Sequence, residues 1–307
     1  MNIATIVVFL VFLVIAYGLS YWAFRARRDR SAYVGLYLLF GFPGVLLVVA
    51  GLALAIYGRS NGWAFLAIGL GFLLPLVKPV REFVASFTPM DPASPVDMAG
   101  LAILLPVIAY LGFSYLAAPD PESITTSVSV EELIVQVLAL VGFAYAAVGT
   151  GFYRTFREAS GRLGLVRPTW SMIGIALLFM ALIFVVNGAA SAITQAVQPD
   201  LYKEIEDATK NLTANVQNPA GALLLGVSAG VGEELLLRGA VQPRFGIILT
   251  SLLFALLHVQ YGLTFVLIGL FLTGALLGIE RKRYGTTAAI ITHAMFDVLV
   301  VLAQTAS

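Results

Sequence analysis

Six ionisable residues lie inside long apolar stretches in the last third of the chain, and three short patterns contain all of them. The patterns are EELLLR at 233–238, FALLH at 254–258 and HAMFD at 293–297. An ionisable group at the centre of a membrane helix costs about 2.5 kcal/mol or more, so several together indicate a functional site. Carboxylates and imidazoles are the groups that transfer protons near neutral pH, and they also bind metals.

Helical spacing predicts how these side chains pair. Glu234 and Arg238 are four residues apart, share one helix face and are expected to form an ion pair. Glu233 points about 100° away from that face and remains a free carboxylate. His293 and Asp297 are also four residues apart, so the carboxylate can fix the tautomer of the imidazole ring.

The depth of the three patterns predicts that they meet. If the chain turns at Pro243-Arg244, a rise of about 1.5 Å per residue places Glu233 about 15 Å and His258 about 21 Å from that turn. Counted from Tyr284, His293 lies about 13 Å and Asp297 about 19 Å into its helix. We therefore expect the four side chains to lie in one layer.

The patterns EExxxR, FxxxH and Hxxx(N/D), in this order on separate apolar helices, resemble the CAAX prenyl endopeptidase and bacteriocin-processing (CPBP, or Abi) family of intramembrane peptidases. The resemblance covers about residues 221–302. It implies that Glu233 and His258 activate a water for attack on a peptide carbonyl. It also implies that Glu234 and Arg238 are a structural pair, and that His293 and Asp297 stabilise the oxyanion. Where the family has Asn, an amide donates to the oxyanion; ionised Asp297 instead holds His293 in its donating form.

Two versions of this chemistry remain open. We prefer a glutamate-type peptidase without a cofactor, because a carboxylate and an imidazole suffice to activate water. The alternative is a metalloprotease in which Glu233, His258, His293 and Asp297 bind a divalent metal such as zinc. The zinc-protease pattern HExxH does not occur. A non-catalytic interpretation also exists, in which the same groups make interhelical hydrogen bonds.

The remaining composition is that of a membrane protein. Of the 307 residues, 60% are hydrophobic and 11% are charged, against about 25% charged in soluble domains. The net charge of +1 is too small for a nucleic-acid partner, which requires a clustered basic excess. The absence of cysteine excludes disulfides and a cysteine nucleophile.

Apolar stretches that are long enough to cross a bilayer, or nearly so, recur along the chain and predict an all-α, polytopic transmembrane bundle of about ten spans. The predicted spans are 3–24, 32–57, 63–77, 99–118, 131–152, 170–193, 219–238, 246–259, 262–280 and 287–304. They divide the chain into N-terminal helices without evident catalytic residues (1–195) and a C-terminal catalytic core (196–307).

The basic residues predict the orientation. Arginines at 25–30 and the basic run at 281–283 lie between spans that would share the cytoplasmic side, which places both termini outside, in the cell membrane. The loops 119–130 and 195–219 are then external and solvated. The second contains the sequon Asn211-Leu212-Thr213, a glycosylation site in a host with that machinery.

Several other patterns have structural explanations. Ser129 and Glu132 form the capping box of a helix. The GxxxG steps 226–230 and 274–278 allow helices to approach closely. Pro43, Pro75 and Pro106 are expected at kinks or helix ends.

The sequence thus predicts an intramembrane endopeptidase. Its expected partners are membrane lipids and a membrane-anchored or prenylated (CAAX-type) protein or peptide substrate. The alternatives are a proton- or ion-coupled transporter, in which the same side chains form a relay, and a non-catalytic membrane scaffold or immunity protein.

Overall fold

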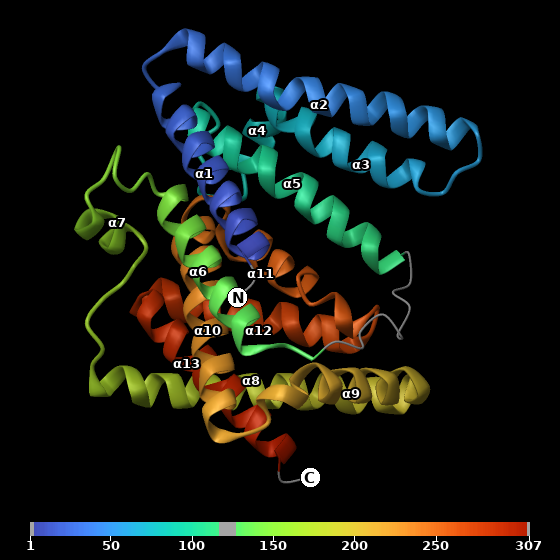
Figure 1. Cartoon of the computed structure of the whole chain (residues 1–307), viewed down its shortest axis with the longest axis vertical. Coiled ribbons are helices and arrows are strands. Elements are labelled where there is room, and N and C mark those ends of the chain that lie inside the picture. The colour runs from blue at the N-terminus through green and yellow to red at the C-terminus, as the bar shows by residue number, and fades with distance from the viewer. Residues whose placement is uncertain (1–2, 117–126, 306–307) are drawn as a thin grey trace. The chain divides into compact units, whose positions relative to one another are not determined.

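The computed structural model describes residues 3–116 and 127–305, and the elements in these ranges are helices without a β-strand (Figure 1). The all-α prediction is therefore confirmed. Residues 119–126 of the predicted loop 119–130 lie outside the described ranges. The α-helices are α1 (Ile3–Arg25), α2 (Arg30–Ile56), α3 (Gly62–Leu73), α4 (Lys78–Ala85), α5 (Pro95–Leu116), α6 (Val130–Ala147), α7 (Phe156–Arg162), α8 (Trp170–Val197), α9 (Pro199–Thr213), α10 (Pro219–Glu233), α11 (Gln242–Leu256), α12 (Phe265–Tyr284) and α13 (Thr286–Thr305).

One compact unit comprises residues 18–118 and 244–246. Within it, α2 and α3 run side by side (Figure 1). Glycines allow this approach: a Cβ on Gly51 would lie 2.6 Å from the backbone nitrogen of Leu66, and one on Gly62 would lie 2.6 Å from that of Ala55. After α3 the chain bends by 87° into α4. Pro75 lies in the short 3₁₀ turn at this bend, as expected for a proline at a helix end.

Pro43 and Pro106 behave differently from Pro75. Each lies inside a continuous helix, α2 and α5 respectively. A membrane helix tolerates proline when neighbouring groups satisfy the freed carbonyl. These two prolines therefore do not end a helix.

The second unit comprises residues 1–17, 119–243 and 247–307 and contains all three sequence patterns. Here α10 packs against α13 through Gly226 and Gly230: added Cβ atoms would lie 2.5 Å from the carbonyl oxygen and 2.9 Å from the nitrogen of Ala294. On α12, a Cβ on Gly274 would lie 3.0 Å from the Cα of Ser251 in α11. The prediction that these glycines permit close helix packing is confirmed.

The number of spans differs from the prediction of about ten. In the described ranges, seven helical segments are long and apolar enough to cross a membrane, or eight if α3 and α4 count as one bent span. The predicted spans 219–238 and 246–259 belong to one helical run, Pro219–Leu256. The predicted span 262–280 lies in α12, which is not among the seven because it ends in Glu280 and three basic residues. The polytopic fold itself is confirmed.

Two local predictions also need correction. The turn expected at Pro243-Arg244 is absent, since both residues lie in α11; the helix is kinked instead at Gly246, whose φ of 75° is accessible to glycine but not to most residues. The stretch 195–219 is largely helical, since it contains the end of α8, all of α9 and a 3₁₀ turn. The division of the chain at residue 195 stays a prediction; that residue lies within α8.

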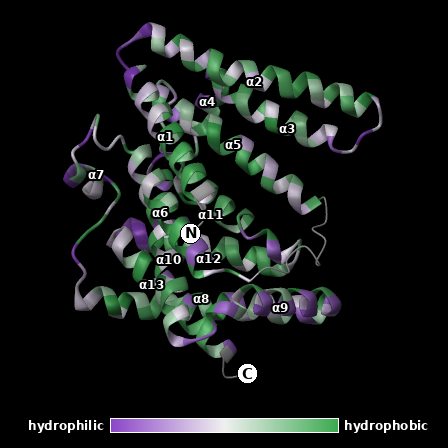
Figure 2. Ribbon diagram, in the orientation of Figure 1, coloured by the Kyte–Doolittle hydropathy of each residue, from purple (hydrophilic) through white to green (hydrophobic). Residues whose placement is uncertain are grey.

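Hydrophilic residues gather where the sequence predicts solvent. Helices α7 and α9 contain many hydrophilic residues, whereas the long helices are mostly hydrophobic (Figure 2). The charged side chains of α9 are exposed and its buried side is apolar around Ile205. The capping box of Ser129 and Glu132 is present at the start of α6 and is confirmed.

Candidate active site

A small cavity in the second unit lies among four helices and the turn after α11. Its volume is about 80 Å³, enough for a few water molecules. The lining residues come from α8 (Ile183 and Asn187), α11 (Phe254), the turn after α11 (His258 and Tyr261), α12 (Leu270, Thr273 and Leu277) and α13 (His293, Phe296 and Asp297). Three of the four predicted catalytic residues therefore meet at one cavity.

The first pattern lies where α10 changes into a π-helix. Glu233 is the last residue of α10, and Glu234 begins a π-helical segment, Glu234–Val241. Such i→i+5 segments are rare and are often found at functional sites. The segment keeps Glu234 and Arg238 fully buried, with their ion pair at 3.2 Å between Oε2 and Nε.

Glu234 also bonds to the third pattern. Its Oε1 accepts a hydrogen bond from Nδ1 of His293 at 2.9 Å. The sequence predicted only the pair with Arg238, because a contact between distant segments has no helical spacing. Glu234 is thus the anion between two buried groups that can each carry a positive charge.

Arg238 is held mainly by charge and by packing. Its guanidinium lies 4.6 Å from the ring centre of Phe254, a cation–π contact, and its Nη2 donates to the carbonyl oxygen of Gly274 at 3.3 Å. The ion pair with Glu234 lacks hydrogen-bond geometry, so Nη1 of Arg238 and Oε2 of Glu234 are buried without hydrogen-bond partners. Burial without full pairing costs free energy.

His293 lies between two carboxylates. Nδ1 faces Glu234, and Nε2 lies 3.4 Å from Oδ2 of Asp297. The second distance exceeds the usual 2.7–3.2 Å of an N–H···O bond, so Asp297 holds Nε2 loosely. The ring is therefore oriented by its Nδ1 bond, and when both ring nitrogens are protonated the Nε2–H is a donor beside Asp297 at the cavity wall.

His258 has a different environment. Its Nδ1 lies 2.8 Å from the carbonyl oxygen of Phe254. A carbonyl only accepts, so Nδ1 carries the proton and Nε2 of the neutral ring keeps a free lone pair. The ring packs against that of Phe254, with centroids 4.8 Å apart. His258 thus presents a proton acceptor at the cavity.

Glu233 is half-buried and is not among the residues that line the cavity. Its Oε2 is buried without a hydrogen-bond partner. Its charge acts on Arg238, His293 and Asp297, which places it beside the same polar cluster. Within the described ranges it forms no hydrogen bond with His258, so a water or a substrate group would have to connect the two.

The four residues do not fit a metal ion as they are arranged. In the described part of the chain, no group of three or more His, Asp or Glu side chains could hold a metal. Both nitrogens of His293 face carboxylates, so neither offers a lone pair outward. Among the four residues, Nε2 of His258 and Oε2 of Glu233 keep a lone pair without a hydrogen-bond partner.

Two cavity residues were missed by the sequence analysis. Asn187 and Thr273 lie on spans that were treated as generic membrane helices, yet the Nδ2 of Asn187 donates to Oγ1 of Thr273 at 2.8 Å. An Asn in the middle of the apolar span 170–193 was a usable signal, because polar side chains at membrane depth usually bond to another helix. Glu280, where the predicted span 262–280 ends, does not line the cavity. It is fully buried and accepts from Thr292 at 2.7 Å.

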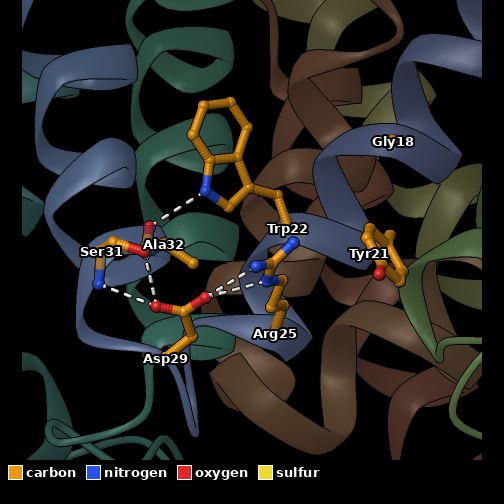
Figure 3. A pocket seen from close by; sticks show the side chains of 7 residues that line it. All are labelled: Gly18, Tyr21, Trp22, Arg25, Asp29, Ser31 and Ala32. Carbon is orange, nitrogen blue, oxygen red and sulfur yellow. Dashed lines mark hydrogen bonds and ion pairs between the residues drawn. The ribbon is translucent and has the colours of Figure 1, made fainter.

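A second, more open cavity of about 400 Å³ lies at the turn between α1 and α2 (Figure 3). Its polar groups pair with one another. Arg25 bonds to Asp29 at 2.9 Å, Asp29 caps α2 through the backbone nitrogens of Ser31 and Ala32, and Trp22 donates to the carbonyl oxygen of Ala32. The hydrogen bonds to Ser31 and Ala32 also lower the pKa of Asp29. These contacts are those expected where a capped helix begins, so they account for the polar groups at this turn.

Comparison with known proteins identifies the C-terminal region. Residues 215–299 match the family model described as "Type II CAAX prenyl endopeptidase Rce1-like", which confirms the resemblance drawn from the three patterns. Neither the curated proteins nor the solved structures yield a match. The matched segment covers α10 to most of α13, so it contains every residue of the three patterns. With seven helices in its described residues that are long and apolar enough to cross a membrane, the chain is an integral membrane protein, and its C-terminal segment is similar to the Rce1-like family.

Proposed function

Because residues 215–299 match the family model of type II CAAX prenyl endopeptidases, we propose that the chain is an intramembrane endopeptidase that hydrolyses a peptide bond of a membrane-anchored or prenylated (CAAX-type) protein or peptide. The observation that carries this proposal is the contrast at the cavity. His258 presents a free Nε2, while His293 is fixed by Glu234 and lies at the same cavity with its Nε2 beside Asp297. A proton acceptor and a proton donor facing one water-sized cavity are what hydrolysis requires.

In the proposed reaction, a water in the cavity attacks the carbonyl carbon of the scissile bond. The water oxygen forms the new C–O bond, its proton passes to Glu233 or His258, and the carbonyl π pair moves to the oxygen. His293 donates through Nε2 to this oxyanion, and Asp297 keeps that nitrogen protonated. Collapse of the intermediate breaks the C–N bond, and the base returns the proton to the leaving amine. The products are a carboxylic acid and an amine.

The glutamate-type mechanism is our preference over a metalloprotease. Glu233 has an unpartnered oxygen beside the cluster, and the steps above require from the protein only a proton acceptor and proton donors. The poor fit of the four side chains to a metal supports this preference. Removal of metal ions provides a direct test, because a zinc enzyme loses its nucleophile with its zinc.

The cavity limits what the site itself can hold. At about 80 Å³ it accommodates the reacting carbonyl and a water, not a prenyl chain. Most of its other lining residues are apolar, so the flanking part of the substrate would meet a dry surface suited to a membrane-embedded segment. We further propose the cell membrane as the location, with both termini outside, because the basic runs at 25–30 and 281–283 would then be cytoplasmic.

The deciding experiment measures cleavage of a library of prenylated, lipid-anchored and transmembrane peptides by purified protein. Wild type, Glu233→Gln and wild type treated with chelator are compared, with Glu280→Gln as the matched buried control. We expect loss of cleavage by about 10²–10⁴-fold in Glu233→Gln, and full activity with chelator and in Glu280→Gln. Loss with chelator would establish the metalloprotease. Wild type that cleaves nothing but moves protons across vesicles would favour the transporter.

A further inference from the structure

We propose, on the basis of the proposed peptidase function, that the hydroxyl of Thr273 is a second donor to the carbonyl oxygen of the scissile bond and that Asn187 positions it. Thr273 lies on α12 and Asn187 on α8, outside the three sequence patterns. Both line the cavity that contains His258 and His293. Thr273 is buried, with 5% of its surface exposed.

The amide of Asn187 has only one sensible orientation. The atom assigned as Nδ2 lies 2.9 Å from the carbonyl oxygen of Ile183. That oxygen only accepts, so exchanging the amide nitrogen and oxygen would place two acceptors in contact. Nδ2 therefore faces Ile183, and its second hydrogen is directed at Oγ1 of Thr273, 2.8 Å away.

The bond from Asn187 decides where the Thr273 proton points. Because Oγ1 accepts the amide hydrogen, its own proton must turn in another direction. Other helical threonines in the described ranges donate to the carbonyl four residues back: Thr194 to Ala190 at 2.9 Å and Thr209 to Ile205 at 2.8 Å. No described acceptor takes the proton of Thr273. The hydroxyl is thus a donor held without an acceptor at the cavity wall.

The cavity has a use for such a donor. Where the family has an amide at the last motif position, this chain has Asp297, whose carboxylate cannot donate when ionised. His293 is engaged at Nδ1 by Glu234 and faces Asp297 with Nε2. Thr273 supplies a neutral hydrogen bond to the oxygen on which negative charge develops, and such a donor acts mainly in the transition state.

The test is steady-state cleavage by purified full-length protein, with Thr273→Val as the main variant because it removes the hydroxyl and keeps the shape. We expect kcat to fall about 10²-fold with little change in KM, as for loss of one oxyanion donor. Thr273→Ser should restore most of the activity, which a packing role would not explain. Thr194→Val is the matched control, since its proton already bonds to Ala190, and it should keep the wild-type kcat.

Asn187→Ala tests the positioning role. It frees the Thr273 proton to bond within its own helix, so kcat should fall, and the double variant with Thr273→Val should be no slower than Thr273→Val alone. Additive losses would overturn the positioning by Asn187, and wild-type kcat in Thr273→Val would overturn the donor. If Thr273→Val does not fold, Thr273→Ala replaces it. Activity retained in Glu233→Gln would refute the proposed role of Glu233, and the effect of Thr273→Val would still test the donor. A wild type that cleaves no peptide would overturn the peptidase function and the Thr273 donor together.

Discussion

Each of the two units buries an arginine, and the two arginines are satisfied in different ways. Arg81, in the unit of residues 18–118, donates to the carbonyl oxygens of Pro92, Pro75 and Leu76 at 2.7–3.0 Å. None of its nitrogens is among the buried atoms without a partner. Arg238, in the other unit, has a carboxylate and one carbonyl, and its Nη1 remains without a hydrogen bond.

The contacts of Arg81 are structural, whereas the network around Arg238 has hydrogen-bonding atoms that are not used. The contacts of Arg81 hold the backbone at the bend between α3 and α4, and they are complete. The network of Arg238, Glu234, His293 and Asp297 borders a cavity, and buried oxygens of Glu233 and Glu234 lack partners. Incomplete pairing of buried polar groups costs free energy and is found where a site must bind or react.

The largest effect should come from Glu234→Gln. The substitution removes the anion that faces both Arg238 and His293, and an uncompensated buried guanidinium costs about 3–5 kcal/mol. We expect the free energy of unfolding to fall by that amount and cleavage to be lost. Denaturant unfolding and the peptide assay measure both.

Glu280→Gln is the control for that variant. The carboxylate of Glu280 accepts from Thr292, and an amide oxygen can accept the same bond, so the loss should be below about 1 kcal/mol. Equal destabilisation in the two variants would contradict the special role assigned to Glu234.

A smaller effect, on stability alone, is expected for Arg81→Met. It leaves three carbonyl oxygens without their donor, which should lower the free energy of unfolding by about 3 kcal/mol. The cleavage rate per folded molecule should not change, because the network is structural. A drop in that rate, measured at a temperature where the variant is fully folded, would mean that Arg81 also serves the reaction.

The smallest effect is expected for Asp297→Asn. The contact to Nε2 of His293 is long, 3.4 Å, and the Asn oxygen can accept the same proton while its amide hydrogens face the cavity. We expect kcat/KM to change by less than about tenfold, which corresponds to about 1.4 kcal/mol of transition-state free energy. Asp297→Leu, which removes both functions, should lose more. A loss in Asp297→Asn as large as that in Glu233→Gln would show that the negative charge itself is required.

Local patterns predicted what a single helix determines. The long apolar stretches indicated membrane helices, and the ion pair of Glu234 and Arg238 has the four-residue spacing expected of one helix face. The small residues at 226–230 also indicated close packing, because glycine leaves room for a facing backbone. These features depend on residues within one or two turns of each other.

Contacts between helices could not be predicted in the same way. The bond from His293 to Glu234 joins residues 59 positions apart, and no periodicity specifies such a pair. The Asn187–Thr273 bond was missed for the same reason. The turn was misplaced because a proline at 243 is also acceptable in the first turn of a helix, whereas Gly246 has the positive φ that kinks the helix.

The π-helical segment at 234–241 has a consequence for mutational scanning. Its i→i+5 bonds place about one more residue in each turn than an α-helix has. In a scan of substitutions along α10 and α11, positions that do not tolerate substitution should repeat every three to four residues before Glu234. After Val241 the same helix face should be reached about one residue later than that repeat predicts. An alignment of tolerance profiles that assumes a single helical period would assign the wrong face to every residue beyond it.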